Sequence, residues 1–467
     1  MPTTWPSRSG CPPCCTPSAG TPTGRSDRTR WAAGRSTRSP AASGRRSSRG
    51  STTRSSAPPI TWSTSSPPVC GGRTRSTRGR KGVSPVDLAP TPEQRAYRDE
   101  VRALLGTDEV RAETAAIRTR PGTEGGLLDV YRKLGERGLL APNWPREYGG
   151  SGRGIAEKAI LTEELIAHGV PDIAHTLSVD IVGLALLLFG TDRQKERLLP
   201  PIARGESVAG VLFSEPEAGS DLSALRTRAE RDGDGWRLSG RKVYSAKTQL
   251  ADFALCAART TESEVRFHGI TVFLVPLRTP GVGVEPLWNI GDERFNEVTF
   301  SGIRVTAEDV LGIVDDGWRI IGEVLGLERT GIEFQAKARR WLDAALERTG
   351  TAGLSPAEAG RLVALDAEVR AARLLAWRCV DDIHAGRSDE VRSAMAKYWA
   401  GETGREVALA ASETVGLDAL LAGDDEESLG HGVLEAACRE APGLTLASGT
   451  SEVMLTVIAS AGLGLLA

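Results

Sequence analysis

Hydrophobic and polar residues follow two different periods along the chain. Between 85 and 207 the apolar positions recur at helical spacing, as in "TPEQRAYRDEVRALL", where Thr91 can cap a helix and Pro92 suits its first position. Between 208 and 308 apolar residues alternate with polar ones, as in "NEVTFSGIRV", and turns separate β-branched runs. Helical spacing returns over 309–467. This order predicts an α+β chain with an N-terminal helical domain, a middle β-barrel-like domain and a C-terminal four-helix bundle.

Residues 1–84 show neither period. They are rich in Ser, Thr, Pro, Gly and Arg, and the first 81 hold fourteen arginines and Lys81 against one acid, Asp27. Such a segment cannot bury enough apolar surface to offset the entropy of ordering, so we expect a disordered leader. The composition matches upstream translation of GC-rich DNA in a wrong frame, which would put the true start near Val83.

Other interpretations of this leader are weaker. Cys11 and Cys14 have the spacing of half a zinc site, but no second half follows. An organellar transit peptide would carry an amphipathic apolar stripe, which is missing. A tail that binds nucleic acid would suit the charge, because phosphates attract arginine.

The rest of the chain has the composition of a globular protein. The 467 residues carry a formal net charge of −2, so the part after the basic leader is acidic. The apolar run at 181–189 is far too short to cross a bilayer and predicts a buried helix. Cys256, Cys379 and Cys438 are scattered and odd in number, which fits a reducing cytoplasm. We therefore expect a cytoplasmic protein whose partners are neither nucleic acid nor a membrane.

Most catalytic motifs are missing from the sequence. It contains no clustered metal ligands, no Gly-x-Ser-x-Gly turn and no phosphate-binding loop, and its five histidines are isolated. The segment "FSEPEAGSDL", residues 213–222, stands out where helical spacing changes to strand spacing. It is either a rigid turn or a loop whose backbone amides and small hydroxyls approach a ligand.

Several segments together resemble the acyl-CoA dehydrogenase family. In chain order they are "LGERGLLAPNWPREYGGSG", "FGTDRQKERLLPPIARGE", "SEPEAGSDL", "GITVFLVPLRTPGVGV", "NEVTFSGIRV" with "GWRII", and "GTSEV". The resemblance covers about residues 90–467. It implies FAD-dependent α,β-dehydrogenation of an acyl thioester, in a homo- or hetero-tetramer that passes electrons to electron-transfer flavoprotein or a similar acceptor. The α-proton then goes to a base and the β-hydride to flavin, while hydrogen-bond donors stabilise the thioester oxygen.

The position of the base departs from the commonest family pattern. Many relatives read Tyr-Glu-Gly-Thr where this chain reads Ala447-Ser448-Gly449-Thr450. The serine hydroxyl cannot replace a carboxylate at neutral pH. Isovaleryl and long-chain relatives instead carry the base in a Leu-Glu-Arg sequence, which this chain has with Glu328 at its centre. The resemblance therefore implies Glu328 as the base and the Ser448 N–H as an oxyanion donor.

The same resemblance implies which residues contact FAD. Phe213 and Ser214 would contribute backbone groups and Ser220 a polar side chain, and Tyr244 would lie against the isoalloxazine. The hydroxyl expected two residues after Tyr244 falls on Ala246, unless Ser245 replaces it. The remaining residues implied at the cofactor are Thr450 and Arg348.

The half of the FAD site that relatives build across a subunit interface is degraded. Arg348 stands at its family position, but the Phe-Gly that follows in relatives is lost. Glu413 and Leu417 replace an amide and a glycine in the segment that reaches a neighbouring subunit's FAD. A partner chain of different sequence could supply this half.

Three hypotheses stay open at this point. The first is a flavin-dependent acyl-thioester dehydrogenase, alone or as one subunit of a mixed complex in which only one subunit type has a working site. The second is a flavin monooxygenase on the same scaffold, which needs no base at Glu328. The third is a non-catalytic structural subunit, which would be colourless when pure.

Overall fold

The computed structural model describes residues 89–119, 125–291, 293–350, 353–428 and 430–465. The expectations for 1–84, including disorder, a late start and half a zinc site, lie outside these residues. Within them, helices come first, strands follow and helices return, so the predicted fold class is confirmed.

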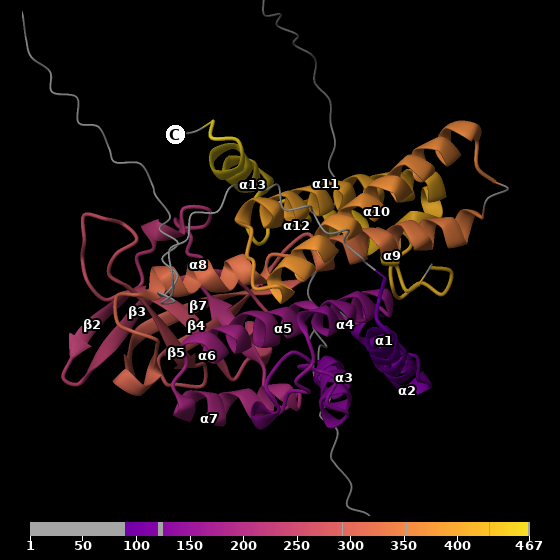
Figure 1. The fold of residues 1–467 in the computed structure, drawn as a ribbon. Helices are drawn as coiled ribbons and strands as arrows, with labels where there is room; N and C mark the ends of the chain where they lie inside the picture. Colours follow the sequence, from indigo (N-terminus) through magenta and orange to yellow (C-terminus); the bar gives the residue numbers. More distant parts are fainter. Residues whose placement is uncertain (1–88, 120–124, 292, 351–352, 429, 466–467) are drawn as a thin grey trace, which may run out of the picture. The chain divides into compact units, whose positions relative to one another are not determined.

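Helices make up the described chain before residue 208 (Figure 1). Thr91 caps the first of them through a reciprocal pair of hydrogen bonds with Gln94, and Pro92 takes its first position, as the sequence predicts. The run at 181–189 divides between a π-helix and a short α-helix, and Val182, Ala185 and Leu186 are fully buried. The helices are α1 (Pro92–Leu105), α2 (Asp108–Thr119), α3 (Gly125–Glu136), α4 (Ile155–Ala167), α5 (Ile173–His175), the π-helix η2 (Thr176–Gly183), α6 (Leu184–Phe189) and α7 (Asp192–Ala203).

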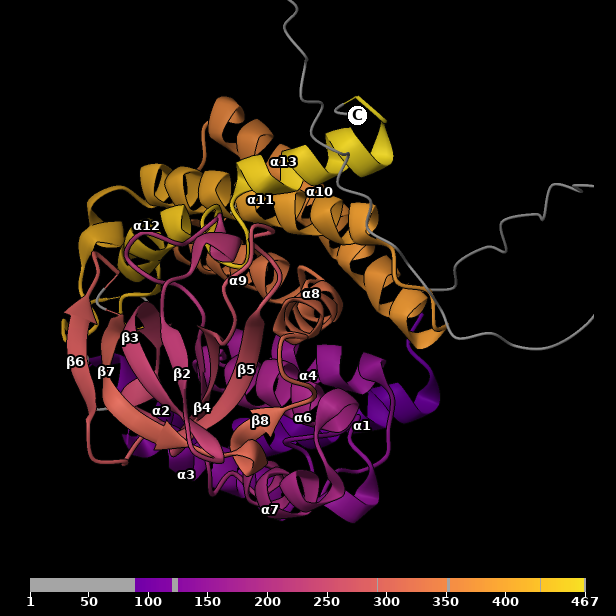
Figure 2. The same ribbon diagram turned by 90° about the vertical axis from the view of Figure 1, so that its left-hand side faces the viewer.

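Eight strands of the described chain form one sheet, seen in Figure 2. Their order is β6-β7-β3-β2-β4-β5-β8, and β1 pairs with β4 outside this path. The pairs β1–β4 and β2–β4 are parallel and the others antiparallel. The register of β3 on β7 shifts between Lys242 and Ser245, at the expected flavin motif. The strands are β1 (Ala209–Leu212), β2 (Arg228–Asp232), β3 (Gly235–Ala246), β4 (Phe253–Arg259), β5 (Ile270–Pro276), β6 (Val282–Trp288), β7 (Arg294–Val305) and β8 (Val310–Leu311).

Four of the C-terminal helices pack together as a bundle, in which α9 and α11 each contact the other members. Small residues along α11, such as Ala400, Gly404 and Ala408, are buried and allow this close approach. A separate helix, α8 (Gly317–Glu328), packs against β5, and α13 (Ser451–Val457) packs against α11. The bundle helices are α9 (Ile332–Thr349), α10 (Pro356–His384), α11 (Glu390–Val415) and α12 (Val433–Leu444).

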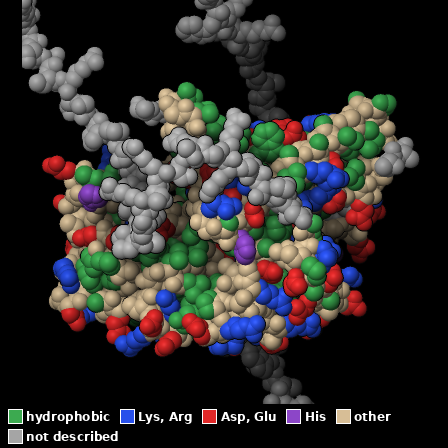
Figure 3. Space-filling model, in the orientation of Figure 1, with side chains coloured by type: hydrophobic (Ala, Val, Ile, Leu, Met, Phe, Trp, Pro, Cys, Tyr) green, Lys and Arg blue, Asp and Glu red, His purple; other side chains and the backbone are tan. Residues whose placement is uncertain are grey.

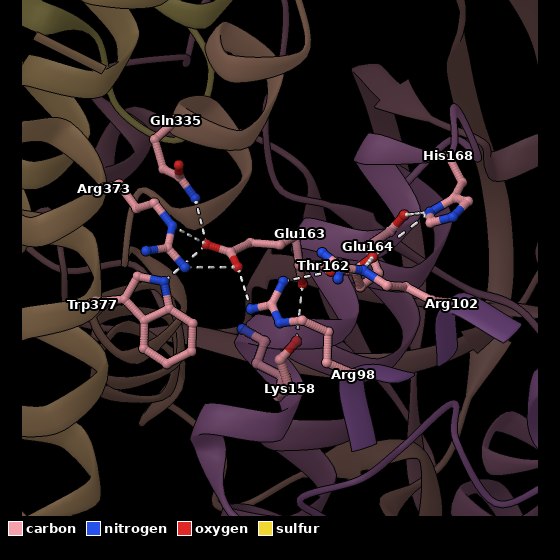
Figure 4. A network of polar contacts seen from close by, with 10 residues as sticks. All are labelled: Arg98, Arg102, Lys158, Thr162, Glu163, Glu164, His168, Gln335, Arg373 and Trp377. Atoms are coloured by element: carbon pink, nitrogen blue, oxygen red, sulfur yellow. Dashed lines mark hydrogen bonds and ion pairs between the residues drawn. The ribbon is translucent and has the colours of Figure 1, made fainter. Parts of the chain in front are cut away.

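A buried carboxylate joins the N-terminal helices to the bundle (Figure 4). Glu163 on α4 accepts hydrogen bonds from Arg98 of α1 at 2.6 Å and from Gln335 of α9 at 3.1 Å. It also accepts bonds from Arg373 and Trp377 of α10, at 3.0 and 2.8 Å. Burial alone would raise the pKa of Glu163, but the two arginines outweigh it and the pKa is lowered. The network holds α4 in place against α9 and α10.

The surface is of mixed charge. On the face drawn in Figure 3, Lys and Arg side chains are interspersed with Asp and Glu. Within the described residues, no helix combines the length and apolar character needed to cross a membrane.

Candidate active site

Glu328 lies at the last position of α8 and is buried. Its side chain lines a cavity between α8, α4, η2, the start of α9 and the C-terminal end of α10. One wall of the cavity is apolar, because Ala159, Ile332 and Val380 belong to a small buried cluster there. Ile155 packs against this cluster and also lines the cavity. The remaining lining residues are polar or charged: Lys158, Thr162, Thr176, Asp180, Thr330 and Glu333. The cavity therefore presents a carboxylate beside an apolar surface.

A buried ion pair forms part of the polar wall. The Lys158 ammonium of α4 lies 3.1 Å from the Asp180 carboxylate of η2, and both side chains are at most 10% exposed. Asp180 also has the His175 ring behind it, with Nδ1 at 3.9 Å. The other ring nitrogen of His175 is 2.9 Å from the Leu140 carbonyl. The irregular η2 segment thus brings Asp180 toward α4, and π-helical turns are frequent at functional sites.

Two glutamates share this cavity. Burial raises the pKa of Glu328, and Asp180 adds to the rise, while Lys158 and Arg329 oppose it. Burial and the nearby Glu328 raise the pKa of Glu333 to about 8. Two buried carboxyl groups at close quarters do not both ionise readily. Burial therefore disfavours the charged form of both carboxyl groups, and Lys158 favours it in both.

The turn before α13 contacts Arg329, the residue that follows Glu328. Arg329, the next residue in the chain, donates from Nε to the Ser448 carbonyl at 3.0 Å. Ser448 is exposed and has a left-handed backbone, with φ of 54°. Gly449 follows with φ of 92°, and a Cβ there would stand 2.7 Å from the Met454 methyl. The bond links the residue after Glu328 to the Ser448 turn, and the shared role of Glu328 and Ser448 stays a prediction.

Thr450 has a local role in the same turn. Its backbone is extended, and its hydroxyl accepts a hydrogen bond from the Val453 N–H at 3.3 Å, so it caps α13. The first residue of that helix, Ser451, donates to Glu402 of α11 at 2.6 Å. The small-residue turn is therefore a rigid connection between α12 and α13, and its exposed peptide groups stay available to a ligand.

The loop "FSEPEAGSDL" is a tight turn held from inside. Glu215 and Ala218 exchange two backbone hydrogen bonds, of 3.0 and 3.1 Å, across Pro216. The Glu215 carboxylate is buried and accepts from the Lys242 ammonium at 2.8 Å. Lys242 also donates to the Phe213 carbonyl at 3.0 Å. Burial would raise the pKa of Glu215, but Lys242 and the backbone N–H donors outweigh it, so the pKa is lowered.

This anchoring leaves the outer edge of the loop accessible. Gly219 and Ser220 are exposed, and no atom lies within 4 Å of where a Gly219 Cβ would be. Phe213 is buried, and the Ser214 carbonyl accepts from the Val243 N–H at 3.0 Å, which ties the loop to β3. Backbone groups of Gly219 and Ser220 can therefore contact a ligand without moving the loop.

Tyr244 projects from the irregular part of β3. It has φ of 57° and its side chain is 64% exposed, which is unusual for an aromatic residue within a strand. Ser245 is buried instead, and its hydroxyl makes no hydrogen bond with the residues that the structure describes. The two neighbours therefore face opposite ways, and Tyr244 is the one that offers a flat apolar surface to a ring system.

Arg348 has an acidic partner in its own chain. Its Nε lies 2.9 Å from Asp418 in the turn after α11, and the terminal guanidinium nitrogen also contacts that carboxylate. Glu413, one α-helical turn before that point, pairs with Arg361 of α10. Leu417 is largely exposed between them. The two segments that the sequence assigns to a neighbouring subunit's FAD thus lie side by side, with their charges paired internally.

Several residues of these sites were not found by sequence reasoning. Lys158, Asp180 and Glu333 join Glu328 only through packing of four different elements. Glu333 had a weak signal, since it stands five positions after Glu328 in "LERTGIE", and Lys158 had one as a cation inside an apolar helical run. No sequence signal indicated the buried Glu215–Lys242 pair, because the segments that contain these two residues drew attention to other positions.

Comparison with known proteins places the chain in a family. Models of the acyl-CoA dehydrogenase N-terminal, middle and C-terminal domains match residues 91–206, 210–303 and 315–463. The Mycobacterium tuberculosis acyl-CoA dehydrogenase FadE34 is 35% identical to this chain, and the matched region covers 78% of this chain and 50% of FadE34. FadE29 of the same organism is 32% identical over 81% of this chain and 98% of its own length.

The solved structures agree. The ChsE4–ChsE5 complex from Mycobacterium tuberculosis matches 82% of this chain and all of the compared chain, at 27% identity and a TM-score of 0.71. The sequence resemblance to this family is thereby confirmed. The chain belongs to the acyl-CoA dehydrogenase family, flavoprotein oxidoreductases that act on a CH–CH bond of acyl thioesters.

Proposed function

We propose that this protein removes hydrogen from the α and β carbons of an acyl thioester, with Glu328 as the base. The observation that carries the proposal is the buried carboxylate of Glu328 in a cavity beside an apolar wall. The next residue, Arg329, bonds to the turn that holds Ser448. A base in such a place is shielded from water and has an apolar surface beside it.

The chain's own residues carry the proton chemistry. The Glu328 carboxylate takes the α-proton, and the electron pair left behind forms the double bond as a hydride leaves the β-carbon. Negative charge develops on the thioester oxygen, and the Ser448 N–H donates to that oxygen. Arg329 holds the Ser448 carbonyl and so fixes the orientation of that turn. Bound FAD supplies the acceptor for the hydride, and electron-transfer flavoprotein or a similar protein would reoxidise it.

The residues of the β domain suit the isoalloxazine half of FAD. Tyr244 is exposed and held in a left-handed conformation, so it can lie against the ring. The exposed edge of the 213–222 loop offers the Gly219 backbone and the Ser220 hydroxyl. The ion pair between Lys242 and Glu215 keeps that loop in place. Phe213, Ser214, Ser245 and Thr450 remain proposals for the cofactor site.

The dinucleotide half of an FAD shared with a second subunit fits this chain less well. Arg348, which the resemblance implies at a neighbouring subunit's FAD, is paired with Asp418, and nearby Glu413 is paired with Arg361. A phosphate-binding surface needs unpaired donors. We therefore infer that the chain works in a mixed assembly, where a different subunit supplies the phosphate-binding half. The ChsE4–ChsE5 complex shows that a similar chain takes part in a complex of two named components.

The activity can be tested on the purified protein with and without FAD. Anaerobic titration with a panel of acyl-CoA thioesters should bleach the flavin absorbance and yield the α,β-unsaturated thioester by mass spectrometry. A control without thioester should keep its colour. Flavin that stays oxidised with every thioester, yet is consumed with a reductant and oxygen, would instead support a monooxygenase. Protein that binds no flavin alone or with its genomic neighbours would support a structural subunit.

The Arg348–Asp418 pair gives a second prediction, for cofactor affinity. Asp418→Asn frees the guanidinium, and a hydrogen bond to a charged group is worth about 1.5–3 kcal/mol. Because the pair is exposed, we expect FAD dissociation constants to fall by no more than roughly tenfold. Asp424→Asn removes another acidic charge, a little further along the chain, and should leave affinity unchanged. Equal affinity in the Asp418 variant and the unaltered protein would place Arg348 outside the flavin site.

A further inference from the structure

The wall of the cavity around Glu328 carries a cation, Lys158. Its ammonium is buried, and α4 is held in position by the Glu163 network one helical turn further along. The Lys158 carbonyl also accepts a hydrogen bond from the Thr162 hydroxyl at 3.3 Å. Lys158 is therefore fixed by the protein rather than placed by solvent, and its charge is a permanent feature of this wall.

A buried carboxylate that must accept a proton needs such a charge. Desolvation favours the neutral acid, and a neutral Glu328 cannot take the α-proton. Within the described residues, the titratable groups that line the cavity beside Glu328 are Lys158 from α4, Asp180 from η2 and Glu333 from α9, and α10 contributes only the apolar Val380. Arg329 points instead to the turn at Ser448.

Burial and the neighbouring charges act in opposite directions on the ionisation of Lys158 and Glu328. Asp180 neutralises part of the Lys158 charge at 3.1 Å, with His175 behind it. Burial lowers the pKa of Lys158, but Asp180, Glu328 and Glu333 together outweigh it and the pKa is raised. The ammonium thus stays charged, is paired with Asp180 and lines the same cavity as Glu328.

On the assumption that Glu328 is the base of the proposed reaction, we propose that Lys158 is a positioning residue that keeps the Glu328 carboxylate ionised, and that Asp180 limits this effect by sharing the same ammonium. Lys158 touches neither reacting carbon in this role. It acts through Glu328, by setting the pH above which the base is able to accept a proton.

The proposal predicts shifts of opposite sign in two variants. In Lys158→Met the carboxylate loses its nearby cation, so the midpoint of the pH profile for flavin reduction should move up by about one to three units. Lys158→Arg keeps the charge and should restore most of the original midpoint. In Asp180→Asn the ammonium is no longer shared, so the midpoint should move down.

A second readout does not depend on turnover. The carbonyl stretch of protonated Glu328, followed by infrared difference spectroscopy against pH in the full-length protein, gives the titration of this group directly. The band is assigned by its loss in Glu328→Gln. It should persist to higher pH in Lys158→Met and vanish at lower pH in Asp180→Asn.

Lys337 provides the matched control. It is another mostly buried lysine on α9 paired with carboxylates, Asp172 at 3.6 Å and Glu440, and it does not line the cavity. Lys337→Met should lower stability without moving either midpoint.

Failure of the proposal for Lys158 can be distinguished from failure of the proposed function. A uniform loss of rate in Lys158→Met with unmoved midpoints in both readouts would overturn the proposal and leave Lys158 as a packing residue. The proposal is equally overturned if Lys158→Arg behaves like Lys158→Met. If acyl thioesters do not reduce the flavin at all, the proposed function fails, yet the infrared titration still decides the role of Lys158.

Discussion

Glu328→Gln is expected to slow flavin reduction by an acyl thioester about 100- to 10,000-fold, the usual contribution of a general base. The amide keeps the size and polarity of the side chain at the end of α8 but cannot accept the α-proton. Binding of the thioester should persist, because the apolar wall and the turn at Ser448 are unchanged. Stopped-flow absorbance of the flavin under anaerobic conditions measures the rate, and its dependence on thioester concentration measures binding.

Glu323→Gln is the appropriate control for this experiment. Glu323 lies on the same helix, is partly exposed and pairs with Arg319 at 3.0 Å on the outer surface. Its loss should leave flavin reduction within a factor of about two, since surface pairs contribute little. An unaltered reduction rate in Glu328→Gln would remove this residue as the base and favour a chain that serves as a catalytically reduced partner.

Lys242→Met is expected to lower the free energy of unfolding by about 3–5 kcal/mol, because it leaves the Glu215 carboxylate buried without its cation. Glu215 would keep only the backbone N–H groups of Arg226 and Thr227, at 2.6 and 2.8 Å. The Phe213 carbonyl would lose its donor as well. The 213–222 loop should loosen, so FAD should also bind more weakly. Chemical denaturation with and without added FAD measures both effects.

The neighbouring Arg241 separates this effect from a general loss of charge on β3. Arg241 is exposed and lies 3.5 Å from Glu297 on β7. Arg241→Met should cost at most about 1 kcal/mol, as exposed ion pairs do. If Lys242→Met is no more destabilising than Arg241→Met, the buried pair does not hold the loop.

The sequence alone determined the order of helices and strands, and it supplied predictions for the residues of the candidate site. Helical and strand spacing recur over many residues, and each period reports one local geometry, so the three-part α+β plan could be predicted. Thr91 and Pro92 mark the start of α1 by chemistry that acts within four residues. Glu328 as the base stays a prediction, which rests on its Leu-Glu-Arg context and on the missing carboxylate at Ser448.

Tertiary structure alone decided the electrostatics of the site. Glu163 binds Gln335 and Trp377 across 172 and 214 residues of chain, and no periodicity specifies such a pairing. Lys158 and Asp180 meet because η2 is π-helical, and Arg348 meets Asp418 because α9 and α11 pack side by side. Burial and charge pairing depend on distances between elements. Spacing along the chain predicts the elements themselves, but it carries no information on which side chains finally share one cavity.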